Sequence, residues 1–205
     1  AYAQVLMKSV RRHHPSSERY IIVCDELRSG GPTSDNAHVL SVNDLEIPEF
    51  ESMKLRYNVM ELSTAIKPFS AQFLDARHPG ANIIYLDPDI LVTAPLAHVE
   101  AALEEGAEVV LTPHITFPLQ DGYMPDDLSI MKSGIYNLGF VAFRLKKESR
   151  ILLDWWCDRC TKDAIVDIAD NKFTDQRWMD MAPAFVRETH ILRHHCYNLA
   201  YWNLA

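Results

Sequence analysis

The sequence predicts a single α/β domain in which helices cover both faces of a mixed central sheet. Strand-like and helix-like segments alternate along the chain without an internal repeat, which is the pattern of α/β architecture. The length of 205 residues suits one domain. Hydrophobic residues make up 48% and charged residues 23% of the chain, so it can bury a core, and disordered and fibrous classes are excluded.

The charge balance limits the possible partners. The chain has 28 Asp and Glu against 20 Lys and Arg, a formal net charge of -8, and therefore lacks the broad basic surface that would hold nucleic acid. No apolar run approaches the roughly 20 residues of a membrane-spanning helix. Four cysteines are too few for a disulfide scaffold. We therefore expect a cytoplasmic protein without a membrane span and without a nucleic-acid partner.

The first segment is predicted to be a helix that ends at Pro15. Its apolar residues recur at helical spacing, at Ala3, Leu6, Met7 and Val10. Residues 20–24 form a short apolar run, typical of a strand covered on both faces, and the turn-rich stretch 28–36 predicts a loop. Because the chain opens inside a helix and ends abruptly at Ala205, we expect a fragment that lacks its first strand and continues further.

Residues 53–77 read as helical with one interruption. We expect Ser63 to cap the second helix, with Pro68 in its first turns. The residues at helical spacing that should face the core are Leu62, Ile66, Phe69 and Phe73. Residues 83–86 then form the strongest predicted strand, which stops at Asp87.

The rest of the chain continues the alternation. Pro95 opens a short helix, residues 108–112 predict a strand, and Asn137-Leu138-Gly139 is interpreted as the entry to a strand at 140–143. A helix through residues 151–156 follows. A shorter helix is expected from Asp175 to Met181, ending before Pro183.

Asp87 and Asp89 flank Pro88 at the carboxyl end of an apolar strand, where open α/β sheets place their ligand sites. Two carboxylates at this spacing can share a divalent cation, which would neutralise a diphosphate and stabilise charge on a phosphate leaving group. The alternative is an ordinary surface turn, because Asp and Pro both favour turns.

The segment Ile83 to Thr93, Ile-Ile-Tyr-Leu-Asp-Pro-Asp-Ile-Leu-Val-Thr, resembles the DxD segment of GT-A-fold glycosyltransferases. Further segments resemble other parts of these enzymes in the same order along the chain. They are the first helix (1–10), the helix that approaches the nucleotide (61–68), the sugar-side loop (135–140), the "DQ" segment of family-8-type members (174–176) and a late loop over the donor (197–203).

This resemblance implies that residues 1–205 belong to a GT-A-like, Rossmann-like nucleotide-diphospho-sugar transferase domain, similar to bacterial enzymes of surface-polysaccharide biosynthesis. It implies transfer of a glycosyl (hexosyl) group, with retention, from a nucleotide-diphosphate-sugar to a hydroxyl of a carbohydrate or lipid-linked acceptor. A UDP-sugar is the favoured donor, and Mn²⁺ or Mg²⁺ is the implied cofactor.

The site residues are carried over by motif. Asp87 and Asp89 would hold the metal, with His195 as a third ligand, although the His-x-x-Gly-x-x-Lys-Pro stretch of family 8 is missing. Asp175 and Gln176 would lie beside the anomeric carbon in a positioning role. The donor would contact Thr64, Lys67, Asp87, Asp89, Asn137, Gly139 and Asn198.

Each of these assignments has a structural alternative. Lys67 suits a solvated helix face, Asn137 to Gly139 a strand-entry turn, Asp175 a helix cap and His195 the protein surface. Other function classes also remain open. A non-catalytic sugar-nucleotide-binding or scaffold domain could keep the same fold. An HAD-type phosphatase also begins with Asp-x-Asp, but its following Thr is replaced by Leu91.

Overall fold

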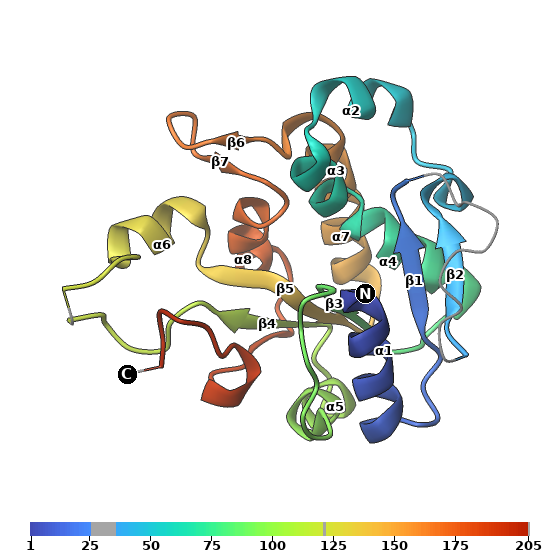
Figure 1. The fold of residues 1–205 in the computed structure, drawn as a ribbon, viewed down its shortest axis with the longest axis horizontal. Coiled ribbons are helices and arrows are strands. Elements are labelled where there is room, and N and C mark those ends of the chain that lie inside the picture. Colours follow the sequence, from blue (N-terminus) through green and yellow to red (C-terminus); the bar gives the residue numbers. More distant parts are fainter. Residues whose placement is uncertain (26–35, 121, 205) are drawn as a thin grey trace.

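The computed structural model describes residues 1–25, 36–120 and 122–204 and has a mixed four-stranded sheet at its centre (Figure 1). The strand order is β3-β5-β4-β8. The strands are β3 (Ile83–Leu86), β4 (Val109–Pro113), β5 (Tyr136–Phe143) and β8 (Thr189–Ile191). β5 runs antiparallel to β3 and β4, and β8 runs parallel to β4. The carboxyl ends of β3, β4 and β8 therefore meet the amino end of β5 at one edge of the sheet.

Helices cover both faces of this sheet, as predicted. Successive residues of β4 point to opposite faces, so Val109 and Leu111 join the largest apolar cluster while Val110 joins a second one. The largest cluster is packed by α4 (Lys67–Arg77), α7 (Lys147–Asp163), the 3₁₀ helix η2 (Arg177–Met181) and α8 (Ala182–Phe185). The second is packed by α5 (Ala97–Glu104).

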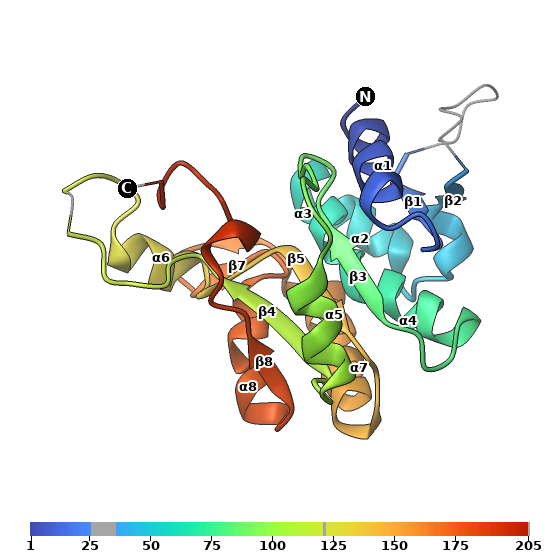
Figure 2. The ribbon, with the colours of Figure 1, turned by 90° about the horizontal axis from the view of Figure 1, so that it is seen from below.

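The predicted strand at 20–24 forms, but it does not join the four-stranded sheet. β1 (Tyr20–Val23) pairs in parallel with β2 (His38–Ser41) in a separate two-stranded sheet. Figure 2 shows these two strands to the right of the four-stranded sheet, with α1 (Tyr2–His13) beside them. Every residue of β1 is only half-buried, because a two-stranded sheet leaves its strands at an edge. Among the described residues, a continuous Rossmann-like sheet is not seen.

The connection between the two sheets is helical, but it is capped differently from the prediction. The elements are η1 (Val42–Leu45), α2 (Phe50–Arg56), α3 (Val59–Ala65) and α4. Ser63 lies inside α3 and donates to the Val59 carbonyl, so its assignment as a cap is wrong. The N-cap residue of α4, the helix that contains Pro68, is Ile66, which makes no side-chain cap. The preceding helix α3 is capped by Asn58, since its side chain accepts from the Glu61 amide and the Glu61 carboxylate accepts from the Asn58 amide. Pro68 stands in the first turn of α4, as expected.

The core-facing residues of this region are confirmed: Ile66 and Phe69 are buried, and Leu62 and Phe73 pack against the same cluster.

The predicted loop 28–36 lies outside the described residues except for Asn36. Among the described residues, no helix is both long enough and apolar enough to cross a membrane.

In the second half of the chain one further expectation is wrong and another holds in part. Asn137 to Gly139 lie inside β5 rather than in a loop before it, because β5 continues past β3 alongside β4. The short helix expected from Asp175 to Met181 forms as the 3₁₀ helix η2, which ends at Met181 as predicted. Pro183 does not end the helical path, however, because it stands in the first turn of α8, where its missing N–H costs no hydrogen bond.

Several short elements were not predicted at all. They are α6 (Asp127–Ser133), β6 (Val166–Asp167), β7 (Lys172–Phe173), β8 and the 3₁₀ helix η3 (His195–Tyr197). Each spans too few residues to show a clear hydrophobic period.

The capping of α3 generates a test. Replacing Asn58 with Ala leaves the Glu61 amide without its acceptor, so Asn58→Ala should lower the free energy of unfolding by about 1 kcal/mol. Ser63→Ala is the control and should change it by less than about 0.5 kcal/mol, because Ser63 caps nothing. Urea unfolding measures both. The reverse order of the two effects would contradict the observed capping.

Candidate functional site

Most of the residues singled out in the sequence gather at the sheet edge where the strand ends meet. The Asp87 amide, just after β3, donates to the Gly139 carbonyl in β5 at 2.7 Å. Lys67 is the first residue of α4, and Asn137 lies in β5 with Gly139. Asp175 and Gln176 directly precede η2, and Asn198 directly follows η3. Hydrogen bonds and ion pairs, some through the Leu138 backbone, connect Lys67, Asp87, Asn137, Gly139, Asp175, Gln176 and Asn198.

Lys67 lies at the centre of this network and is only 4% exposed. Its Nζ donates to the Leu138 carbonyl at 2.9 Å and lies 3.3 Å from Asp175 Oδ2 and 3.4 Å from Asp87 Oδ1. The solvated alternative for Lys67 is therefore wrong. Burial by itself would lower the pKa of Lys67, but the charges of Asp175 and Asp87 outweigh it and raise that pKa. The ammonium stays charged inside the protein.

Asp175 lies on the inner side of Lys67 and is 1% exposed. Its carboxylate caps no helix, because it is turned toward Lys67 and η2 begins two residues later; the helix-cap alternative is wrong. Burial raises the pKa of Asp175, the Lys67 charge opposes this, and the Asp87 charge adds to it. Its Oδ2 meets Lys67 as an ion pair and has no hydrogen-bond partner among the described residues. One ammonium thus faces two carboxylates.

Asp87 is fixed from one side only. Its Oδ1 accepts from the Tyr85 hydroxyl at 2.6 Å and faces Lys67, whereas its Oδ2 has no hydrogen bond among the described residues. Asp89 is exposed, and within the described part of the chain its carboxylate makes no hydrogen bond or ion pair. The free oxygens of this pair of carboxylates are those that a ligand can reach.

Gln176 is used at both ends of its amide. Its Oε1 accepts from the Leu138 amide at 3.1 Å, and its Nε2 donates to the Ser133 carbonyl at 2.8 Å. Gly134 leaves room for this side chain, since a Cβ there would lie 3.1 Å from Gln176 Cγ. Gln176 therefore fixes the start of β5, and with it the Leu138 carbonyl that receives Lys67.

Gly139 allows Asp87 and Asn137 to approach each other. A Cβ at this position would lie 3.0 Å from Asn137 Oδ1 and 3.2 Å from Asp87 Oδ2. Asn137 Oδ1 accepts from the Gly139 amide, and its Nδ2 donates to Asn198 Oδ1 at 2.8 Å. The network therefore extends from the end of β3 to the segment that follows η3.

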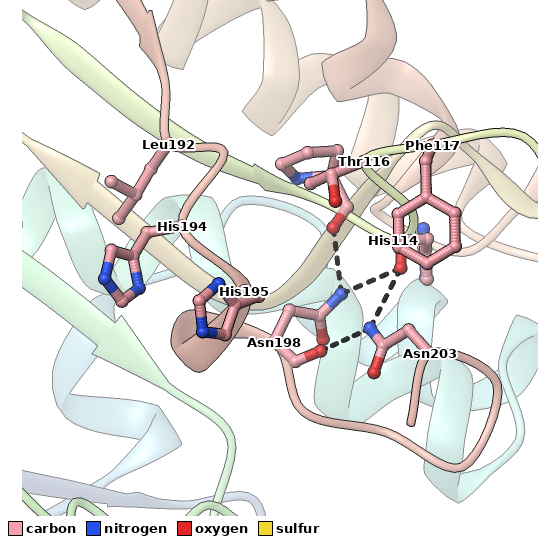
Figure 3. Close-up of a pocket in the computed structure, with 9 residues that line it drawn as sticks. His114, Thr116, Phe117, Leu192, His194, His195, Asn198 and Asn203 are labelled. Atoms are coloured by element: carbon pink, nitrogen blue, oxygen red, sulfur yellow. Dashed lines mark hydrogen bonds between the residues drawn. The ribbon is translucent and has the colours of Figure 1, made fainter. Parts of the chain in front are cut away.

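Asn198 also lines a small, open pocket between the ends of β4 and β8 (Figure 3). The His114 carbonyl accepts from the side chains of Asn198, Trp202 and Asn203, which holds the last segment against the end of β4. Burial lowers the pKa of His114, which keeps its ring neutral at neutral pH. The amides that line the pocket are thus engaged with the protein itself.

The remaining predicted residues lie outside the network. His195 is exposed, lines the pocket and stacks on His194. Thr64 donates to the Glu61 carbonyl one turn before Lys67. Among the described residues, no group of three or more His, Cys, Asp and Glu side chains is arranged to hold a metal ion. The role of His195 as a third metal ligand stays a prediction.

Tyr85 is the site residue that the sequence analysis missed. Its signal was the spacing to Asp87, because residues two apart on a strand share a face.

Comparison of the sequence with protein-family models and with curated proteins found no match.

The buried ion pairs of Lys67 lead to a pH-dependent prediction. Lys67→Met removes the cation that opposes the raised pKa of Asp175, so the pKa of this carboxyl rises further in the folded protein. A raised carboxyl pKa costs stability as the pH rises above the unfolded value of about 4. The variant should therefore lose about 3–5 kcal/mol near pH 8 and clearly less near pH 5.

Urea unfolding at the two pH values measures this effect. Lys54→Met is the matched control, because Lys54 pairs with Glu51 at the surface; its cost should stay below about 0.5 kcal/mol at both values. An equal loss for Lys67→Met at pH 5 and pH 8 would show that Asp175 does not depend on the Lys67 charge.

Proposed function

We propose that the chain is the donor-binding, catalytic domain of a metal-dependent glycosyltransferase of the GT-A type. One observation carries the proposal. Residues that the motif resemblance assigned to a single site, from segments far apart in the sequence, are joined in one network at one sheet edge. This edge holds the carboxyl ends of β3, β4 and β8, where α/β sheets bind ligands.

The energetics of the network support a ligand site rather than a simple turn. A turn at Asp87 needs no buried lysine, and taking an ammonium and a carboxylate out of water costs several kcal/mol per ion before their attraction compensates. Buried ionisable groups whose pKa values are shifted by burial and by a charged partner, as those of Lys67 and Asp175 are, are typical of functional sites.

The donor set suits a hard divalent cation. Asp87 Oδ2 and the Asp89 carboxylate are free carboxylate oxygens, the ligands that Mn²⁺ and Mg²⁺ accept together with phosphate oxygens and water. When all are ionised, Asp87, Asp89 and Asp175 with Lys67 leave two uncompensated negative charges, which one divalent cation balances. Such a cation would supply the positive charge that stabilises a diphosphate leaving group.

The other residues of the network act on the donor through position. Lys67 fixes Asp87 Oδ1 and the Leu138 carbonyl, Asp175 anchors Lys67 from the inside, and Gln176 holds the β5 backbone. Asn137 and Asn198 extend the polar surface toward the pocket. We assign Asn137 and Asn198 to the sugar side of a nucleotide-diphosphate-sugar. The favoured nucleotide is UDP, and the sugar would be transferred with retention to a hydroxyl of a carbohydrate or lipid-linked acceptor.

A thermal-shift titration with UDP, GDP and their sugar conjugates, with and without Mn²⁺, tests the proposal. A ligand that binds only the folded state raises Tm, so we expect stabilisation that needs both the cation and one of the nucleotides. Hydrolysis or transfer of the sugar from that donor then separates an enzyme from a non-catalytic sugar-nucleotide-binding domain. No Tm shift with any pair would contradict the proposed function.

Asp89 offers the sharpest variant for this assay. Asp89→Ala should abolish the Mn²⁺-dependent Tm shift and leave the unliganded Tm within about 1 °C, because its carboxylate is exposed and makes no hydrogen bond or ion pair within the described residues. Asp170→Ala, at another exposed turn, is the matched control and should keep the full shift. A large drop of the unliganded Tm in Asp89→Ala would favour the alternative that these aspartates only build a turn.

A further inference from the structure

Tyr85 shares a face of β3 with Asp87. Ile83 and Tyr85 contact the largest apolar cluster, whereas Ile84 and Leu86 contact the second one, so the strand alternates in the usual way. Asp87 continues this alternation on the side of Tyr85, and α4 brings Lys67 to the same face. The three side chains therefore meet on one side of the sheet edge.

The Tyr85 side chain contacts both of the other two. Its hydroxyl donates to Asp87 Oδ1 at 2.6 Å, and the Lys67 ammonium lies 5.0 Å from the centre of its ring. The Tyr85 hydroxyl is therefore bound directly to Asp87, and its ring lies beside the Lys67 ammonium.

The two donors act on the same oxygen of Asp87. Tyr85 and Lys67 both face Oδ1, and Oδ2 lies on the side of Gly139, where only hydrogen atoms occupy the space of a side chain. Rotation of the carboxylate would break the short bond from Tyr85. The orientation of Asp87, and the oxygen that it offers to a ligand, is thus set by the Tyr85 hydroxyl together with the Lys67 ammonium.

We propose that Tyr85 is a positioning residue that orients the Asp87 carboxylate for a divalent cation. This inference rests on the proposed function, since the cation belongs to it. Partners that orient a metal ligand typically change metal affinity by 10- to 100-fold when they are removed. A tyrosine that serves only the core would instead affect stability alone.

Tyr57 is a tyrosine whose hydroxyl serves only the core. Tyr57 is buried, and its hydroxyl donates to the Cys160 carbonyl and accepts from the Ala164 amide. Tyr57→Phe therefore removes a buried hydroxyl from the core, as a matched control for Tyr85→Phe. In Tyr85→Phe the ring beneath the Lys67 ammonium is kept and only the donor to Asp87 is lost.

The experiment measures Mn²⁺ binding in the presence of UDP, by the electron paramagnetic resonance signal of free Mn²⁺, for the unmodified protein and both variants. We expect Tyr85→Phe to raise the Kd for Mn²⁺ at least tenfold and Tyr57→Phe to leave it within twofold. Thermal unfolding of both variants without ligand shows that each is folded.

The outcomes separate the two proposals. If the unmodified protein and Tyr85→Phe bind Mn²⁺ with the same Kd, the proposed role of Tyr85 is overturned and the proposed function still stands. Failure of the unmodified protein to bind Mn²⁺ with UDP or GDP overturns both. A Tyr85→Phe variant that does not fold also overturns the inference, because the hydroxyl would then be a requirement of the fold.

Discussion

The buried ammonium of Lys67 is the interaction on which the site depends. An isolated ammonium inside a protein costs far more than folding can compensate, so its presence requires the carboxylates of Asp175 and Asp87 and the Leu138 carbonyl around it. These groups come from α4, from the end of β3, from β5 and from the segment before η2. One charge thereby fixes the relative positions of four parts of the chain, and those parts enclose the candidate site.

The sheet edge supplies the geometry that this charge needs. β5 continues beyond β3, so its Leu138 carbonyl and Gly139 lie beside Asp87. Gln176 holds that extension by two hydrogen bonds, and Gly139 leaves the space that Asp87 and Asn137 share. The backbone of β5 is therefore both a strand of the sheet and a wall of the site.

The same residue type serves different purposes at this edge because its surroundings differ. Asp175 is enclosed, its pKa is raised by burial, and its partner is the internal cation. Asp89 is exposed and has no partner among the described residues, while Asp87 stands between them, with one oxygen held and the other free. This change from core to surface places the two aspartates that we propose as cation ligands next to a buried, ion-paired anchor.

The sequence by itself determined the local elements and the chemical groups of the site. Hydrophobic periodicity located β3, β4 and α7, and the position of Asp87 and Asp89 after an apolar strand indicated where a ligand would bind. The Asn58–Glu61 capping box and the Tyr85–Asp87 hydrogen bond were missed, although each joins residues only two or three positions apart. The tertiary structure alone decided that β1 and β2 form a sheet apart from the main one. It also decided that Lys67 is buried rather than solvated. Periodicity depends on neighbours along the chain, whereas strand pairing and the burial of a charge depend on contacts between distant segments, which no local pattern records.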